Sequence, residues 1–277
     1  MKKLFPFVLI ICLSTIGFAQ IDERPENTGD NFSLEGALEL FKKAKSVEEF
    51  ETLLNDEASI VNNIDLNNDQ KTDYISVEDI ANNDTHVLVL STYLNDNDKQ
   101  DIATINIEKT SNNQATIQIV GDPDLYPQNT IAEPFAAAES VQNSKGPNAP
   151  KIVFTQIMVN VWFWPTIQFI YAPRYVIWRS PFRWARYPRW YRPWHPFGYQ
   201  NFYSRAAPYR VVYHRTPNYR VVNARNMYAP RRRTSTLVVH NRRGTTVIYN
   251  NQRQRSPRRN VEINRRQNQN GRGHGRR

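Results

Sequence analysis

The sequence has a single cysteine, Cys12, which lies in an N-terminal apolar run. Removal of that run would leave no thiol, which excludes disulfides, a cysteine nucleophile and thiolate metal sites. Acidic residues are almost missing from the second half: residues 20–150 contain 25 acidic and 8 basic residues, whereas residues 151–277 contain 1 acidic and 26 basic residues. This division predicts an acidic folded part followed by a basic arm that requires an anionic partner.

Catalytic signatures are absent as well. The five histidines lack metal-binding spacing, no serine lies in a Gly-x-Ser-x-Gly sequence, and no glycine-rich loop precedes a predicted helix. His86, with Asp84 nearby, is the acid/base candidate of the acidic part, but a histidine in a surface turn is the favoured interpretation. Asp122 and Asp124 belong to a Gly-Asp-Pro-Asp turn. We therefore predict a protein that is not an enzyme and has no small-molecule substrate.

Residues 1–19 have the pattern of a secretory signal peptide. Two lysines precede an apolar run, Leu4 to Phe18, of the length of a signal-peptide core, and small residues predict cleavage after Ala19. Cys12 follows two isoleucines, so it lacks the small residue that lipoprotein processing requires. We predict export to a periplasmic, envelope-associated or extracellular location. The alternative is an uncleaved N-terminal anchor.

Residues 20–135 predict an acidic α+β domain, in which two short helices pack on a small antiparallel sheet. One helix follows Ser33, and a capping box formed by Ser46 and Glu49 begins the second. Four segments then alternate with period two: 74–78, 87–94, 102–108 and 115–120. The gaps between them are too short for parallel crossovers, which predicts a meander of four or five strands.

The segment 65–76 is a candidate calcium loop. It places oxygen donors at alternate positions, and calcium takes six to eight oxygen ligands. The candidate ligands are Asp65, Asn67, Asp69, the carbonyl of Lys71, and Asp73. The expected role is a structural staple between helix and sheet. The alternative is an Asn/Asp-rich turn held by side-chain to backbone hydrogen bonds, without an ion.

This loop resembles the DxDxDGxxD calcium loops of FG-GAP repeats and, less closely, those of EF-hands and dockerins. The resemblance implies that Asp73 supplies the closing carboxylate. Two positions depart from these patterns: Gln70 stands where glycine is usual, and Ser76 stands where an EF-hand has its bidentate glutamate.

Over residues 45–200 the chain resembles a family of uncharacterised exported bacterial proteins. The segments that carry the resemblance are Asn62 to Asn67, His86 to Leu90, Gln100 to Ile105, Ile119 to Asp122 and the Trp-Pro stretch. The resemblance implies export and the same architecture, and it brings no activity with it.

Residues 136–150 have the composition of a linker. The segment 152–172 then contains no charged residue, which makes a single membrane span possible in length. Three polar residues, Pro165 and two central tryptophans oppose a span, and β-branched residues favour extended strands or an interfacial hairpin. A single-pass membrane protein is therefore the alternative interpretation.

Residues 151–200 form an aromatic, proline- and arginine-rich segment, and residues 201–277 form a basic low-complexity tail. Recurrent prolines exclude a long helix, and arginines between aromatic rings are typical of an interface. We expect a largely disordered tail. The predicted function is attachment of the arm to an anionic envelope surface, either lipid headgroups, lipopolysaccharide or an acidic glycan. Binding of extracellular nucleic acid is the other alternative.

Overall fold

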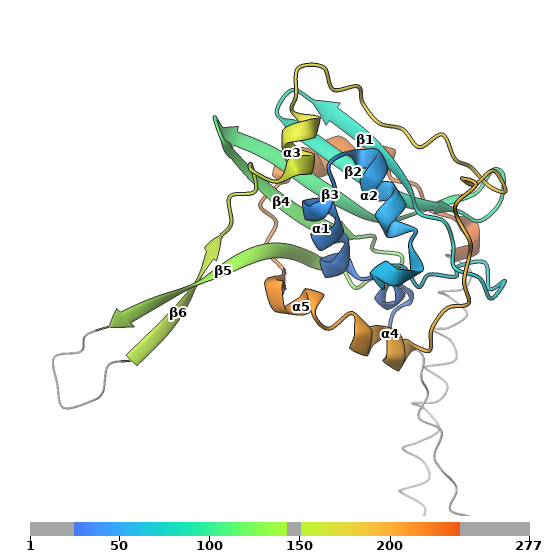
Figure 1. Ribbon diagram of the computed structural model, residues 1–277, viewed down its shortest axis with the longest axis horizontal. Helices are drawn as coiled ribbons and strands as arrows, with labels where there is room; N and C mark the ends of the chain where they lie inside the picture. Colours follow the sequence, from blue (N-terminus) through green and yellow to red (C-terminus); the bar gives the residue numbers. More distant parts are fainter. Residues whose placement is uncertain (1–24, 143–150, 239–277) are drawn as a thin grey trace, which may run out of the picture.

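The computed structural model describes residues 25–142 and 151–238, without the side chains of 137–142 and 151–158. The predicted signal peptide at 1–19 and the tail beyond residue 238 lie outside the described residues. The fold is α+β: a seven-stranded antiparallel sheet with helices on both of its faces (Figure 1).

The two predicted helices are confirmed, and their caps explain where they begin. Helix α1 (Leu34–Lys43) starts after Ser33, whose hydroxyl accepts from the N–H of Gly36. Helix α2 (Val47–Leu54) starts after Ser46, which accepts from the N–H of Glu49. The Glu49 carboxylate reaches back to the N–H of Lys45 rather than to that of Ser46. Both caps satisfy backbone donors that a helix leaves unpaired.

The predicted meander is confirmed and is larger than expected. Its strands are β1 (Ser76–Asn82), β2 (Thr85–Tyr93), β3 (Lys99–Ser111), β4 (Gln114–Gly121), β5 (Ile131–Gln142), β6 (Lys151–Met158) and β7 (Tyr213–Thr216). The order is β1-β2-β3-β4-β5-β6, and β7 also pairs with β5. The β5–β6 hairpin projects from the body of the molecule (Figure 1).

The two faces of the sheet are covered by different parts of the chain. On β2, Leu88 and Leu90 join the large core under α1, α2 and α3 (Pro165–Ile170). Val87 and Val89 point to the other face, where they pack with Val221 and Ala224. These last two residues belong to the segment 217–238, named here the C-terminal strap, which contains α6 (Val222–Tyr228). The side chains of β2 that alternate between the two faces of the sheet are thus buried on both faces.

The prediction of a largely disordered tail is wrong for residues 201–238. This part forms helices α4 (Tyr199–Arg205) and α5 (Tyr209–Val212), strand β7, helix α6 and the 3-10 turn η3 (Ala229–Arg231). The sequence of this part has few apolar residues to stabilise a fold, but its arginines form ion pairs with carboxylates of the acidic half. Arg232 pairs with Asp122 at 2.6 Å, and Arg233 pairs with Asp101 at 3.1 Å.

The boundaries predicted at residues 135 and 150 also need correction. Residues 136–142 are part of β5 instead of a linker, and the core continues into Val161, Trp164 and Tyr213. The segment 152–172 contains strand β6 and the six-residue helix α3, not one long helix. Within residues 25–142 and 151–238, no helix has the length and apolar character that crossing a bilayer requires.

Candidate functional site

The predicted calcium loop forms a compact turn between α2 and β1. The two carboxylate oxygens of Asp65 accept from the N–H groups of Asp69 and Gln70 at 3.1 and 2.9 Å, and Asp69 accepts from Lys71 at 2.9 Å. Gln70 has a φ of 64°, a left-handed conformation that favours glycine. Gln70 therefore has a backbone conformation that glycine would adopt at a lower cost.

Asp73, the predicted closing carboxylate, is buried at the base of this loop. Its Oδ2 accepts from the N–H of Leu66 at 2.8 Å, and the residue is 6% exposed. Burial raises the pKa of the Asp73 carboxyl to about 8; the Leu66 hydrogen bond opposes this shift, and the charges of Asp65 and Asp69 reinforce it. Burial also raises the pKa of Asp65. The loop therefore brings its carboxylates near one another at an electrostatic cost.

The candidate ligands of the loop supply the oxygen atoms that calcium prefers, but these atoms do not converge on one point. All five candidate ligands supply oxygen, and each carboxylate oxygen that accepts an N–H keeps a second lone pair. However, no three acidic, histidine or cysteine side chains converge closely enough to hold a metal ion in the described part of the chain. Calcium would have to draw the oxygens of Asp65, Asn67, Asp69 and Asp73 together.

Outside the loop, the carboxylate of Glu51 joins α2 to residues 151–200, called here the aromatic segment. Its Oε1 accepts from the hydroxyls of Tyr74 and Ser180 at 2.8 and 2.6 Å. Its Oε2 accepts from the indole N–H of Trp178 at 3.0 Å and the backbone N–H of Val77 at 3.1 Å. Burial raises the pKa of Glu51, and these four hydrogen bonds oppose that shift. The role of Glu51 was not predicted, because nothing local distinguishes it from other helix glutamates.

His86 does not form an exposed acid/base site. It is 5% exposed, and its Nδ1 lies 2.9 Å from Oδ2 of Asp79. The Tyr175 hydroxyl donates to the same Asp79 oxygen at 2.8 Å. The three side chains form a buried polar network that ties the aromatic segment to β1 and β2, and the surface-turn interpretation of His86 is wrong.

Two groups of arginines differ in their partners. One group, in β7 and the C-terminal strap, binds carboxylates of the acidic half: besides Arg232 and Arg233, Arg215 pairs with Glu35 at 2.9 Å and Arg220 with Glu133 at 3.1 Å. In contrast, five exposed arginines of the aromatic segment have no carboxylate partner among the described residues. This exposed arginine set consists of Arg174, Arg183, Arg186, Arg189 and Arg192. The charge of the arm is therefore only partly neutralised within the molecule.

Large apolar side chains accompany the exposed arginine set. Val176 is 83% exposed, Ile177 49% and Trp190 47%. Other side chains of the same segment pack on the domain. Tyr191 is buried against Tyr74, with ring centroids 4.9 Å apart, and its hydroxyl donates to the Thr72 carbonyl. The segment thus combines a fixed inner side with exposed cationic and apolar side chains.

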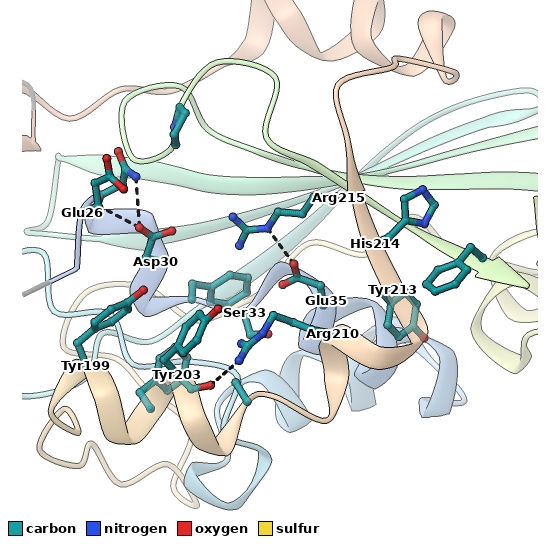
Figure 2. A pocket seen from close by; sticks show the side chains of 16 residues that line it. Glu26, Asp30, Ser33, Glu35, Tyr199, Tyr203, Arg210, Tyr213, His214 and Arg215 are labelled. Atoms are coloured by element: carbon teal, nitrogen blue, oxygen red, sulfur yellow. Dashed lines mark hydrogen bonds and ion pairs between the residues drawn. The ribbon is translucent and has the colours of Figure 1, made fainter. Parts of the chain in front are cut away.

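A separate pocket of about 640 Å³ lies between residues 26–35, near the start of the described chain, and residues 199–215 (Figure 2). Residues before α1 and at its start form one wall, and α4, α5 and β7 form the other. The ion pair of Glu35 and Arg215 lies in this pocket. Asp30 is held there by the N–H and the side-chain amide of Asn27, at 3.0 and 3.2 Å. Sequence reasoning missed this pocket, because its walls come from segments more than 150 residues apart.

Comparison with known proteins adds no assignment to these sites: no family model, no curated protein and no solved structure matches the chain.

Proposed function

We propose that the protein is a non-catalytic, exported envelope protein that attaches to a membrane surface by binding anionic lipid headgroups through its exposed arginine set. The observation that carries this proposal is the division of the arginines. Arg220, Arg232 and Arg233 of the strap pair with carboxylates of the acidic half, whereas the five arginines of the exposed set lie close together in the sequence, face solvent and have no carboxylate partner among the described residues. Guanidinium groups bind phosphate in a bidentate manner, so the free set suits phosphate-rich surfaces.

The apolar neighbours favour a lipid surface over a soluble polyanion. Val176, Ile177 and Trp190 are exposed in the same segment as the arginines, and burying such side chains at the boundary between headgroups and acyl chains is favourable. Acidic polysaccharide and nucleic acid also carry anionic groups, but they offer no acyl layer in which these three side chains could be buried. They remain outcomes of the test below.

The test compares two triple variants of the mature chain, defined here as residues 20–277, on vesicles that contain phosphatidylglycerol. Replacing Arg183, Arg186 and Arg189 with glutamine is expected to weaken binding about 100-fold, because each arginine near an anionic membrane contributes about 1 kcal/mol. Cosedimentation with the vesicles at low and high salt measures this, and screening by salt should release the wild-type protein.

The matched control replaces Arg205, Arg225 and Arg231, which are also exposed, with glutamine. It loses the same charge and is expected to bind nearly as the wild type does. Equal loss in both triple variants would show that net charge alone governs attachment and would contradict the proposal. Preferential binding of DNA or of acidic polysaccharide at equal charge density would also contradict it.

We propose in addition that the loop 65–73 binds one calcium ion as a structural staple, with Asp65, Asn67, Asp69, the Lys71 carbonyl and Asp73 as ligands. The support is the all-oxygen donor set, the left-handed backbone at Gln70 and the crowding of carboxylates that a divalent cation would relieve. The loop joins α2 to β1 and contacts the aromatic segment, where the N–H of Thr72 donates to the Trp194 carbonyl at 2.8 Å.

Calcium is expected to raise the melting temperature of the mature chain by about 5–10 °C at a concentration about 100 times its dissociation constant. Asp69→Asn should abolish this rise, because it removes a charged ligand while its amide oxygen can still accept from the N–H of Lys71. Asp96→Asn, in an exposed turn between β2 and β3, is the control and should leave the rise intact. Differential scanning calorimetry with calcium or chelator decides: a wild type indifferent to both contradicts the calcium proposal.

A further inference from the structure

The pocket in Figure 2 mixes charges of both signs within one cavity. Glu26, Asp30 and Glu35 supply carboxylates, and Arg210 and Arg215 supply guanidinium groups. An anionic ligand would meet the carboxylates, and a cationic ligand would meet the arginines, so either would be repelled by part of the lining. A neutral ligand whose groups both donate and accept hydrogen bonds satisfies both kinds of side chain.

Several of these polar groups retain free hydrogen-bonding capacity. Arg215 uses only its Nε, on Glu35, and its two terminal nitrogens have no protein partner among the described residues. Asp30 uses Oδ2 for both hydrogen bonds from Asn27, which leaves Oδ1 available. In Figure 2 the Arg215 guanidinium extends from β7 toward the side of the pocket that holds Asp30. A pair of neighbouring hydroxyl groups could accept from Arg215 and donate to Asp30 at once.

Two tyrosines on helix α4 form the aromatic wall. Tyr199 and Tyr203 lie one turn apart, with ring centroids 5.8 Å apart and ring planes at 43°. Their hydroxyls have no hydrogen-bond partner within the described chain, and Tyr203 is 47% exposed. The Arg210 guanidinium lies 3.8 Å from the centre of the Tyr203 ring and donates to the Tyr203 carbonyl at 2.8 Å. This contact holds one tyrosine in place before any ligand arrives.

We infer that this pocket binds a neutral oligosaccharide. The C–H face of a sugar ring packs on the tyrosine faces that Arg210 leaves uncovered, and the hydroxyls of the same ring meet a carboxylate oriented by Asn27 and a guanidinium oriented by Glu35. A volume of about 640 Å³ is within the range of small-ligand sites and accommodates two to three sugar rings. The site shares no residue with the exposed arginine set, so it is independent of the proposed membrane attachment.

The experiment titrates the mature chain with three neutral trisaccharides, chitotriose, cellotriose and maltotriose, by isothermal calorimetry and saturation-transfer NMR. At least one is expected to bind, with saturation transfer from tyrosine to the sugar ring protons. Tyr203→Ala is expected to weaken that binding at least tenfold. Tyr199→Phe, which keeps the ring and removes only the hydroxyl, should weaken it to a smaller extent.

Phe163→Ala is the matched control, because Phe163 is an aromatic residue that is 72% exposed and lies outside the pocket. It should leave trisaccharide binding unchanged, and the melting temperature of each variant verifies that it is folded. Three results would overturn the inference: no binding of any trisaccharide at millimolar concentration, equal loss in Phe163→Ala and Tyr203→Ala, or displacement of the sugar by dialanine or inorganic phosphate. The last result would assign the pocket to a charged ligand.

Discussion

Replacing Glu51 with alanine is expected to lower the free energy of unfolding by about 4 kcal/mol, because it leaves two buried and two half-buried donors without an acceptor. Those donors belong to Tyr74, Val77, Trp178 and Ser180. The variant therefore loses the hydrogen bonds that join α2 to β1 and to the aromatic segment through this carboxylate. For a chain of this size the melting temperature should fall by about 8–16 °C. Urea unfolding followed by tryptophan fluorescence measures the change.

Glu51→Gln is the control, and its mild effect follows from the arrangement of the donors. Oε2 faces two N–H groups that can only donate, whereas Oε1 faces two hydroxyls that can also accept. A glutamine can therefore point its oxygen at the N–H groups and its amide nitrogen at the hydroxyls. A loss as large as that of alanine would show that the charge of Glu51, and not its accepting capacity, holds the segment.

The stabilities of the wild type and of Glu51→Gln should differ in their pH dependence. Burial raises the pKa of Glu51 in the folded state above the ordinary glutamate pKa of about 4. The folded state therefore binds a proton more tightly than the unfolded state does. The resulting stabilisation is complete below the ordinary pKa and is lost as the pH rises through the folded-state pKa. Glutamine does not titrate. The stability of Glu51→Gln relative to wild type should therefore increase as the pH rises from about 4 toward neutrality, and no such trend would refute a raised pKa.

A mature chain that ends at residue 216 is expected to be folded poorly and to aggregate, because it lacks the C-terminal strap. Without the strap, Val87 and Val89 become exposed on the second face of the sheet, and each buried valine is worth about 1.5–3 kcal/mol. The strap also brings Arg233 to Asp101 and the Tyr228 hydroxyl to the same carboxylate at 2.8 Å. An exposed apolar sheet face is an association hazard.

The control for this truncation ends at residue 238 and retains every described contact of the strap. It is expected to remain monomeric and to melt close to the full mature chain. Size-exclusion chromatography and binding of a hydrophobic dye compare the two truncations. A stable monomer ending at residue 216 would show that the strap covers the sheet without stabilising it, and the domain boundary would then lie near residue 216.

The sequence by itself determined the local features of this protein. The caps at Ser33 and Ser46 and the antiparallel meander from β1 to β4 were predicted correctly, because each depends on residues a few positions apart. The turn conformation at Gln70 likewise depends on the acidic loop itself. The location of β5 and the packing of residues 201–238 were predicted wrongly, since composition alone described them as linker and disordered tail.

Only the tertiary structure decided which charges are paired. A sequence shows how many arginines and carboxylates a chain has, but any arginine can pair with any carboxylate, and the fold selects the partners. Arg232 meets Asp122 across 110 positions, whereas Arg183 and Arg189 remain exposed without a carboxylate among the described residues. The pocket of Glu35 and Arg215 arises in the same way, across 180 positions. Long-range contacts of this kind depend on the three-dimensional path of the chain, which local propensity and periodicity do not contain.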